Sequence, residues 1–171
     1  MNFLVSLDDR AGVSRRWLRV AQWAVRMAIG IGFLSAVADR FGLWGPPGAP
    51  GVTWGNVAKY NAYVAQLNWF VPAVLIPVVG WIATIAELVL GLALLVGFRL
   101  RWSALLSALL LLAFGLTMTL ALGPHAPLSY SVFAAASAAF LLFATLPAGD
   151  ASCTLIDGEA RGAVKCPPAD A

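Results

Sequence analysis

The chain has 171 residues, of which 61% are hydrophobic and only 11% are charged, and its formal net charge is +3. Soluble domains average about 45–50% apolar and about 25% charged residues, so this composition excludes a soluble globular domain and a disordered chain. Two cysteines are too few for a disulfide scaffold, and an integral membrane protein is the class that remains.

The first predicted elements are a basic segment, residues 1–16, and an apolar run over residues 17–38. A spanning helix needs about 20 apolar residues, and this run is long enough. The same stretch also resembles a secretory signal, because arginines up to Arg26 precede an apolar core and an Ala-Val-Ala pattern ending at Ala38. The run begins at Trp17 and is longer than a signal core, so we interpret it as a span. Cleavage, which would leave three spans, is the alternative.

The longest connection, residues 39–73, is predicted to lie outside and to contain a short helix. Glycines and prolines open it, and Thr53 is a candidate helix cap. Apolar residues then recur at helical spacing, at Val57, Tyr60, Val64, Leu67 and Val71. The rings of Trp44, Trp54 and Trp69 suit the headgroup level of a bilayer, either as an ordinary aromatic belt or as a lid over a ligand.

Three further apolar runs follow, over residues 74–98, 102–122 and 128–146, with a tight turn around His125 between the last two. The predicted fold is therefore an all-α integral membrane protein in which four transmembrane helices form an antiparallel bundle over residues 17–148, with a short interfacial helix in the outer loop. A polar tail, residues 149–171, carries Cys153 and Cys166, which we expect to be free thiols.

Orientation follows from the basic residues, which stay in the cytoplasm when they flank spans. Arginines precede the first span and occupy the turn at Arg99 and Arg101, whereas the outer loop carries only Arg40 and Lys59. We predict a multi-pass protein of a bacterial or archaeal inner membrane with both termini in the cytoplasm. The basic residues then report topology, and the bilayer, not nucleic acid, is the expected partner.

Two charges lie inside the predicted spans. Arg26 is about 13 Å along the first span and Glu87 about 16 Å from the same face, at 1.5 Å per residue. A lone charge at this depth is costly, so matched depth predicts that Arg26 pairs with Glu87. A stripe of small residues surrounds the carboxylate and predicts close approach of another helix: Gly80, Ala83, Glu87 and Gly91.

Hydroxyl groups are expected to complete this polar core. Ser103, Ser107 and Thr117 lie at helical spacing on the third span, and Tyr130 and Ser131 open the fourth. The core either locks the bundle or binds a ligand, and both interpretations stay open. We find no pairing of nucleophile and base and no phosphate loop, and a single histidine argues against a metal site.

Several segments together resemble the DoxX family of small four-helix membrane proteins. They are Arg26 with Gly30 and Phe33, the run Asp39–Gly45, the run Ala86–Gly97, and the run Ala126–Phe133. The resemblance covers residues 26–146, but Asp39-Arg40 stands where many members have a lysine, and the tail lies beyond it. It implies a small membrane partner in redox or stress chemistry, such as a quinone-linked redox assembly, with quinone as the candidate cofactor and Arg26 and Glu87 as a polar pair.

Three hypotheses follow from these observations. In the first, the chain is a non-catalytic subunit of a membrane oxidoreductase, with a quinone head group near the Arg26–Glu87 level. In the second, it is a small transporter or permease in which the intramembrane charges gate a solute. In the third, it is an assembly factor in which these charges only fix the packing of the helices. Quinone or other redox subunits that purify with the protein would distinguish the first from the other two.

Overall fold

A computed structural model describes residues 2–147, with side chains from residue 14 onward. Every regular element in this part of the chain is a helix. They are α1 (Asn2–Arg40), α2 (Val57–Leu67), the short 3-10 helix η1 (Ala73–Leu75), α3 (Ile76–Val96), α4 (Leu100–Leu122), α5 (His125–Ser129) and α6 (Val132–Thr145). The tail with Cys153 and Cys166 lies outside the described residues.

Three helical segments are long and apolar enough to cross a membrane: Ser14–Arg40, Ala73–Val96 and Leu100–Leu122. The predicted all-α fold is therefore confirmed for the described residues, and three of its helical segments are able to span a membrane. The first helix also continues through the predicted basic segment, because no proline interrupts residues 2–40. It ends at Arg40, just before Gly42 turns the chain with a φ of 74°.

The expected fourth span, residues 128–146, is divided in two. α5 ends at Ser129, and Ser131 adopts a left-handed backbone with a φ of 55° before α6 begins at Val132. α6 has 14 residues and is about 21 Å long, which is shorter than the hydrocarbon core of a bilayer. Residues 2–147 thus contain three helical segments of spanning length and one shorter apolar helix, α6.

The helices pack as two close pairs, α1 with α3 and α4 with α6. A Cβ added to Gly30 of α1 would lie 3.1 Å from the Gly91 carbonyl oxygen of α3, and one added to Gly91 would lie 3.2 Å from the Gly30 oxygen. Gly115 of α4 similarly makes room for the Phe133 ring of α6. The close approach predicted for the small-residue stripe is confirmed at Gly91.

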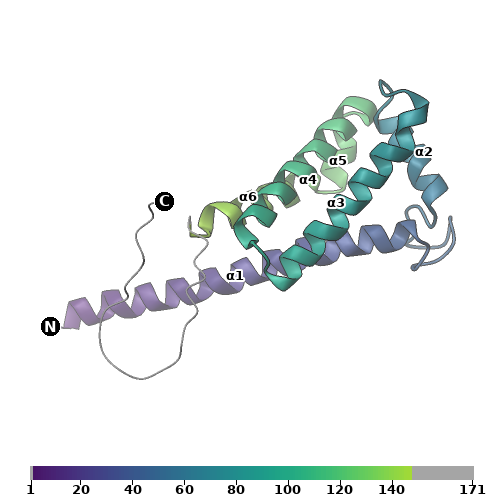
Figure 1. Cartoon of the computed structure of the whole chain (residues 1–171). Coiled ribbons are helices and arrows are strands. Elements are labelled where there is room, and N and C mark those ends of the chain that lie inside the picture. The colour runs from purple at the N-terminus through teal and green to yellow at the C-terminus, as the bar shows by residue number, and fades with distance from the viewer. Residues whose placement is uncertain (1, 148–171) are drawn as a thin grey trace, which may run out of the picture.

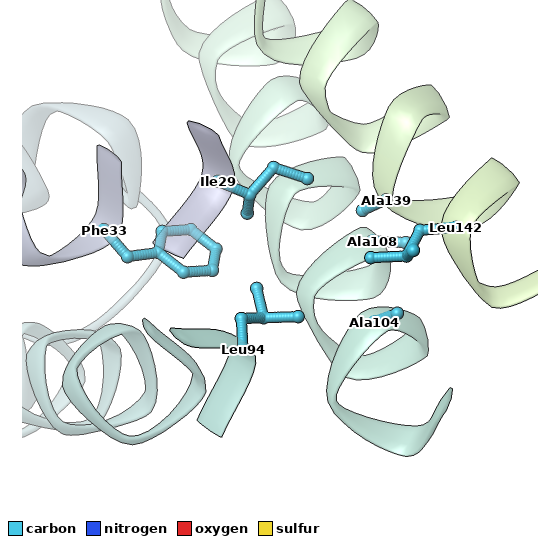
Figure 2. Packing of buried hydrophobic residues seen from close by; sticks show 7 residues of the cluster. All are labelled: Ile29, Phe33, Leu94, Ala104, Ala108, Ala139 and Leu142. Carbon is cyan, nitrogen blue, oxygen red and sulfur yellow. The ribbon is translucent and has the colours of Figure 1, made fainter. Parts of the chain in front are cut away.

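A small apolar core joins the two pairs (Figure 2). It consists of buried side chains from α1, α3, α4 and α6: Ile29, Phe33, Leu94, Ala104, Ala108, Ala139 and Leu142. Next to this core, Arg26 donates to carbonyls of α3, and Gln22 donates to the Thr145 carbonyl of α6. We call the part of the molecule around Gln22 and Arg26 the basic end. The opposite part, formed by α2 and α5, is the α2 end (Figure 1).

Candidate functional site

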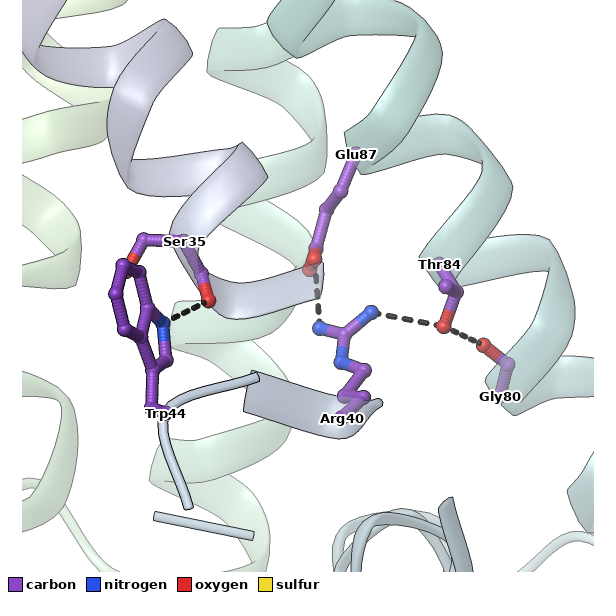
Figure 3. A network of polar contacts seen from close by, with 6 residues as sticks. All are labelled: Ser35, Arg40, Trp44, Gly80, Thr84 and Glu87. Atoms are coloured by element: carbon purple, nitrogen blue, oxygen red, sulfur yellow. Dashed lines mark hydrogen bonds and ion pairs between the residues drawn. The ribbon is translucent and has the colours of Figure 1, made fainter. Parts of the chain in front are cut away.

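A buried ion pair joins α1 to α3 near the α2 end (Figure 3). Arg40, the last residue of α1, places Nη2 2.6 Å from Glu87 Oε2, and both side chains are 3% exposed. Its Nη1 donates to Thr84 Oγ1 at 2.8 Å, and the Thr84 hydroxyl donates in turn to the Gly80 carbonyl. The guanidinium therefore binds two side chains one helical turn apart on α3.

Two aromatic rings cover the same guanidinium. Arg40 Cζ lies 3.9 Å from the centroid of the Tyr60 ring and 5.3 Å from that of Trp54. The two rings meet edge to face, with their centroids 5.3 Å apart. Cation–π contacts are strongest where water is excluded, so α2 contributes directly to holding the buried charge. Burial raises the pKa of Tyr60 above its usual value, although the nearby charge of Arg40 opposes part of this rise. The phenol therefore stays neutral at pH 7.

Asp39 binds the backbone of the loop that carries Trp54. Its Oδ2 accepts hydrogen bonds from the backbone N–H of Thr53 at 3.1 Å and of Trp54 at 2.9 Å. The prediction that Thr53 caps the following helix is wrong. Asn56 takes that place, because its side chain accepts from the Lys59 N–H at 2.8 Å. The helix itself is confirmed, and it buries Tyr60, Val64 and Leu67 of the predicted stripe.

The predicted partner of Glu87 is wrong. Glu87 pairs with Arg40, whereas Arg26 donates from Nε to the Leu94 carbonyl at 3.0 Å and from Nη2 to the Leu95 carbonyl at 3.2 Å. These carbonyls belong to the last turn of α3, which has no helical partners for them and attracts a cation. Equal depth counted from the basic ends of the two helices was a poor guide, because α1 extends beyond the end of α3 there, and Arg26 lies level with the last turn of α3.

A half-open cavity of about 1200 Å³ lies beside the ion pair, between α1 and the α4–α6 pair, with α2 over one end. Most of its wall is apolar, and small residues of α1 and α6 face it, including Gly32, Ala36, Ala135 and Ala138. No atom of another part of the chain would lie within 4 Å of a Cβ added to Gly32. Beyond the core, α1 and α6 therefore stand apart and leave room for a ligand.

The cavity has a polar end. Asp39, Arg40, Glu87 and Tyr60 all line it, together with Thr53 and Trp54 from the loop before α2. Tyr63 and Tyr130 add two further phenols, and burial followed by the neighbouring Tyr130 raises the pKa of Tyr63. The arrangement combines an apolar chamber with hydrogen-bonding and charged groups at one end, as expected for a site that orients an amphiphilic molecule.

The predicted site residues divide between this cavity and other places. Tyr130, Trp44 and Trp54 line it, as does Thr117, whereas Arg26, Ser131 and Trp69 are not among the lining residues. Ser131 forms the bend between α5 and α6, and Trp69 is exposed and packs edge to face on Phe70. Ser103 and Ser107 are buried in α4, where Ser103 donates to the Phe98 carbonyl. A ligand-binding role for any of them stays a prediction.

Sequence reasoning missed Asp39 and Arg40 as site residues and placed both in the outer loop. A usable signal was present, because two adjacent opposite charges directly follow a long apolar run.

Within the described residues no group of three or more histidine, cysteine or acidic side chains could hold a metal ion. Searches of protein-family models, curated proteins and solved structures found no match to this chain.

Proposed function

We propose that this multi-pass membrane protein binds a lipophilic molecule with a polar head and serves as a non-catalytic subunit of a quinone-linked redox assembly. The observation that supports binding is the large apolar cavity that ends at the buried Arg40–Glu87 pair. Ligand pockets commonly measure about 300–1000 Å³, so a cavity of about 1200 Å³ accommodates a ring and part of a tail. The resemblance to the DoxX family supports quinone as the class of ligand and a redox assembly as the partner.

A steric block at Gly32 should remove the ligand without unfolding the protein. Gly32→Phe places a ring where the chain leaves open space beside the cavity, and Ile31→Phe is the matched control because Ile31 is 58% exposed and does not line the cavity. Purified protein is extracted with solvent, and bound quinone is quantified by chromatography. We expect at least about a tenfold loss for Gly32→Phe, corresponding to about 1.4 kcal/mol, and none for the control. Equal quinone content in both variants contradicts the cavity as the site.

The proposed assembly is tested by purification from native membranes in a mild detergent. We expect redox subunits to co-purify with the wild-type chain, and to remain bound when Gly32→Phe has emptied the cavity. Purification of the chain alone, with full quinone content, would retain ligand binding and reject the role as a subunit.

We further propose that α5 and α6 together complete a fourth crossing and that the basic end faces the cytoplasm. The positive-inside rule supports this orientation, since Arg26, Arg99 and Arg101 gather there. After replacement of the native cysteines, single cysteines are introduced at Phe98, in the turn between α3 and α4, and at His125. An impermeant maleimide added to intact cells should label the His125 position only. Labelling of Phe98→Cys alone would reverse the orientation.

A further inference from the structure

Three buried polar atoms at the polar end of the cavity have no hydrogen-bond partner among the described residues; one of them, Glu87 Oε2, faces Arg40 in the ion pair, and the other two have no ion-pair partner either. These two are Asp39 Oδ1 and Arg40 Nε, on side chains that are 5% and 3% exposed. Each residue already uses its other atoms, Asp39 through Oδ2 and Arg40 through both terminal nitrogens. Leaving a buried donor or acceptor unpaired is costly, so these two atoms indicate groups that a ligand can satisfy.

The two atoms need hydrogen-bond partners of opposite kinds. A carboxylate oxygen only accepts hydrogen bonds, and a guanidinium nitrogen only donates them. A head group that satisfies both must therefore donate and accept, as a hydroxyl does. A carbonyl, which only accepts, can satisfy Arg40 but leaves Asp39 unpaired.

The charged residues at the polar end of the cavity further limit which head groups it can bind. Two carboxyl groups, those of Asp39 and Glu87, lie at this end with a single guanidinium, that of Arg40, and all three side chains are buried, whereas Lys59, the other basic residue that lines the cavity, is exposed. An anionic head such as a phosphate would add negative charge to a buried cluster in which carboxyl groups already outnumber the guanidinium, at a place where water cannot screen the repulsion. The site thus favours a neutral head.

We propose that the cavity selects a neutral amphiphile with a hydroxyl head, which donates to Asp39 Oδ1 and accepts from Arg40 Nε. This inference rests on the proposed function, and within the quinone class it means that the protein prefers the reduced quinol, whose ring carries hydroxyls, over the quinone, whose ring carries only carbonyls. Both atoms are covered in the structure, so binding includes a local adjustment of the cavity wall.

The experiment compares a decyl-substituted benzoquinol with its benzoquinone on the full chain in detergent, under anaerobic conditions, by displacement of a fluorescent amphiphile. We expect the quinol to bind about tenfold more tightly or better, because the quinone leaves a buried acceptor unpaired. The test variant is Asp39→Asn. Its amide oxygen can still accept from the Thr53 and Trp54 N–H groups, while its amide nitrogen can donate to a carbonyl. The preference should therefore disappear or reverse, with an unchanged melting temperature showing that the loop is intact.

The outcomes separate the two proposals. Equal binding of quinol and quinone to the wild-type chain overturns the inference and leaves the proposed function standing, whereas no binding of either overturns the proposed function. If Asp39→Asn lowers the melting temperature, Asp39→Glu, which keeps the charge and lengthens the side chain, must still prefer the quinol or the inference fails. A monoacylglycerol, which also carries neutral hydroxyls, is run in parallel. Tighter binding of this lipid than of the quinol supports the hydroxyl head but rejects a quinol as its source.

Discussion

Arg40→Ala should lower the free energy of unfolding by about 3 kcal/mol or more, and adding Glu87→Ala should recover part of that loss. The single change leaves a carboxylate that is 3% exposed without its cation, and removing one partner of a buried pair typically costs about 3–5 kcal/mol. It also removes the hydrogen bond to Thr84 and the contacts with the rings of Tyr60 and Trp54. The double variant leaves neither member of the ion pair buried without its partner.

Melting curves in one detergent for the wild type, the two single variants and the double variant isolate the coupling between these side chains. The matched control is the cycle of Arg26→Ala with Glu87→Ala. Since Arg26 contacts carbonyls of the last turn of α3, it should show coupling near zero with Glu87. Coupling of Glu87 to Arg26 rather than to Arg40 would contradict the structure and restore the pairing expected from depth.

Gly30→Leu should destabilise the protein by about 2 kcal/mol, whereas Gly32→Leu, two residues along the same helix, should be close to neutral in ligand-free protein. At Gly30 a Cβ would lie 2.9 Å from the Leu95 side chain and 3.1 Å from the Gly91 carbonyl oxygen, and the backbone oxygen cannot move without separating α1 from α3. At Gly32 nothing lies within 4 Å. Thermal unfolding of both variants in the same detergent makes the comparison, and equal losses would mean that the two helices do not cross at Gly30.

The long apolar helices were predictable because membrane insertion imposes a coarse requirement, a run of about 20 apolar residues, that is visible in any sequence. The helix α2 was predictable for the same kind of reason, since Tyr60, Val64 and Leu67 bury one face at helical spacing. The break at Ser131 was not, because a serine with a φ of 55° has no distinct signal in an apolar run.

The partners of the charged residues were the least predictable feature. Hydropathy gives the depth of each charge along its own helix, but it says nothing about how far one helix extends beyond another or at what angle they cross. Arg40 meets Glu87 because α1 stops at that level, while α3 extends further and packs against α2. The same tertiary arrangement creates the cavity, so its polar end could not be assigned to Asp39 and Arg40 before the helices were placed.

Photo-crosslinking tests most directly whether an amphiphile occupies the cavity with its head at the Arg40 cluster. Two probes are used, one decyl benzoquinol with a diazirine beside the ring and one with the diazirine at the end of the tail, and the labelled residues are mapped by mass spectrometry. The head probe should label the aromatic residues around Arg40, Trp54 and Tyr60, and the tail probe should label the apolar wall near Ala28 and Ala138. Labelling by both probes on the exposed outer face of α3, at Ile82 and Val89, with none in the cavity, would contradict the proposed binding site.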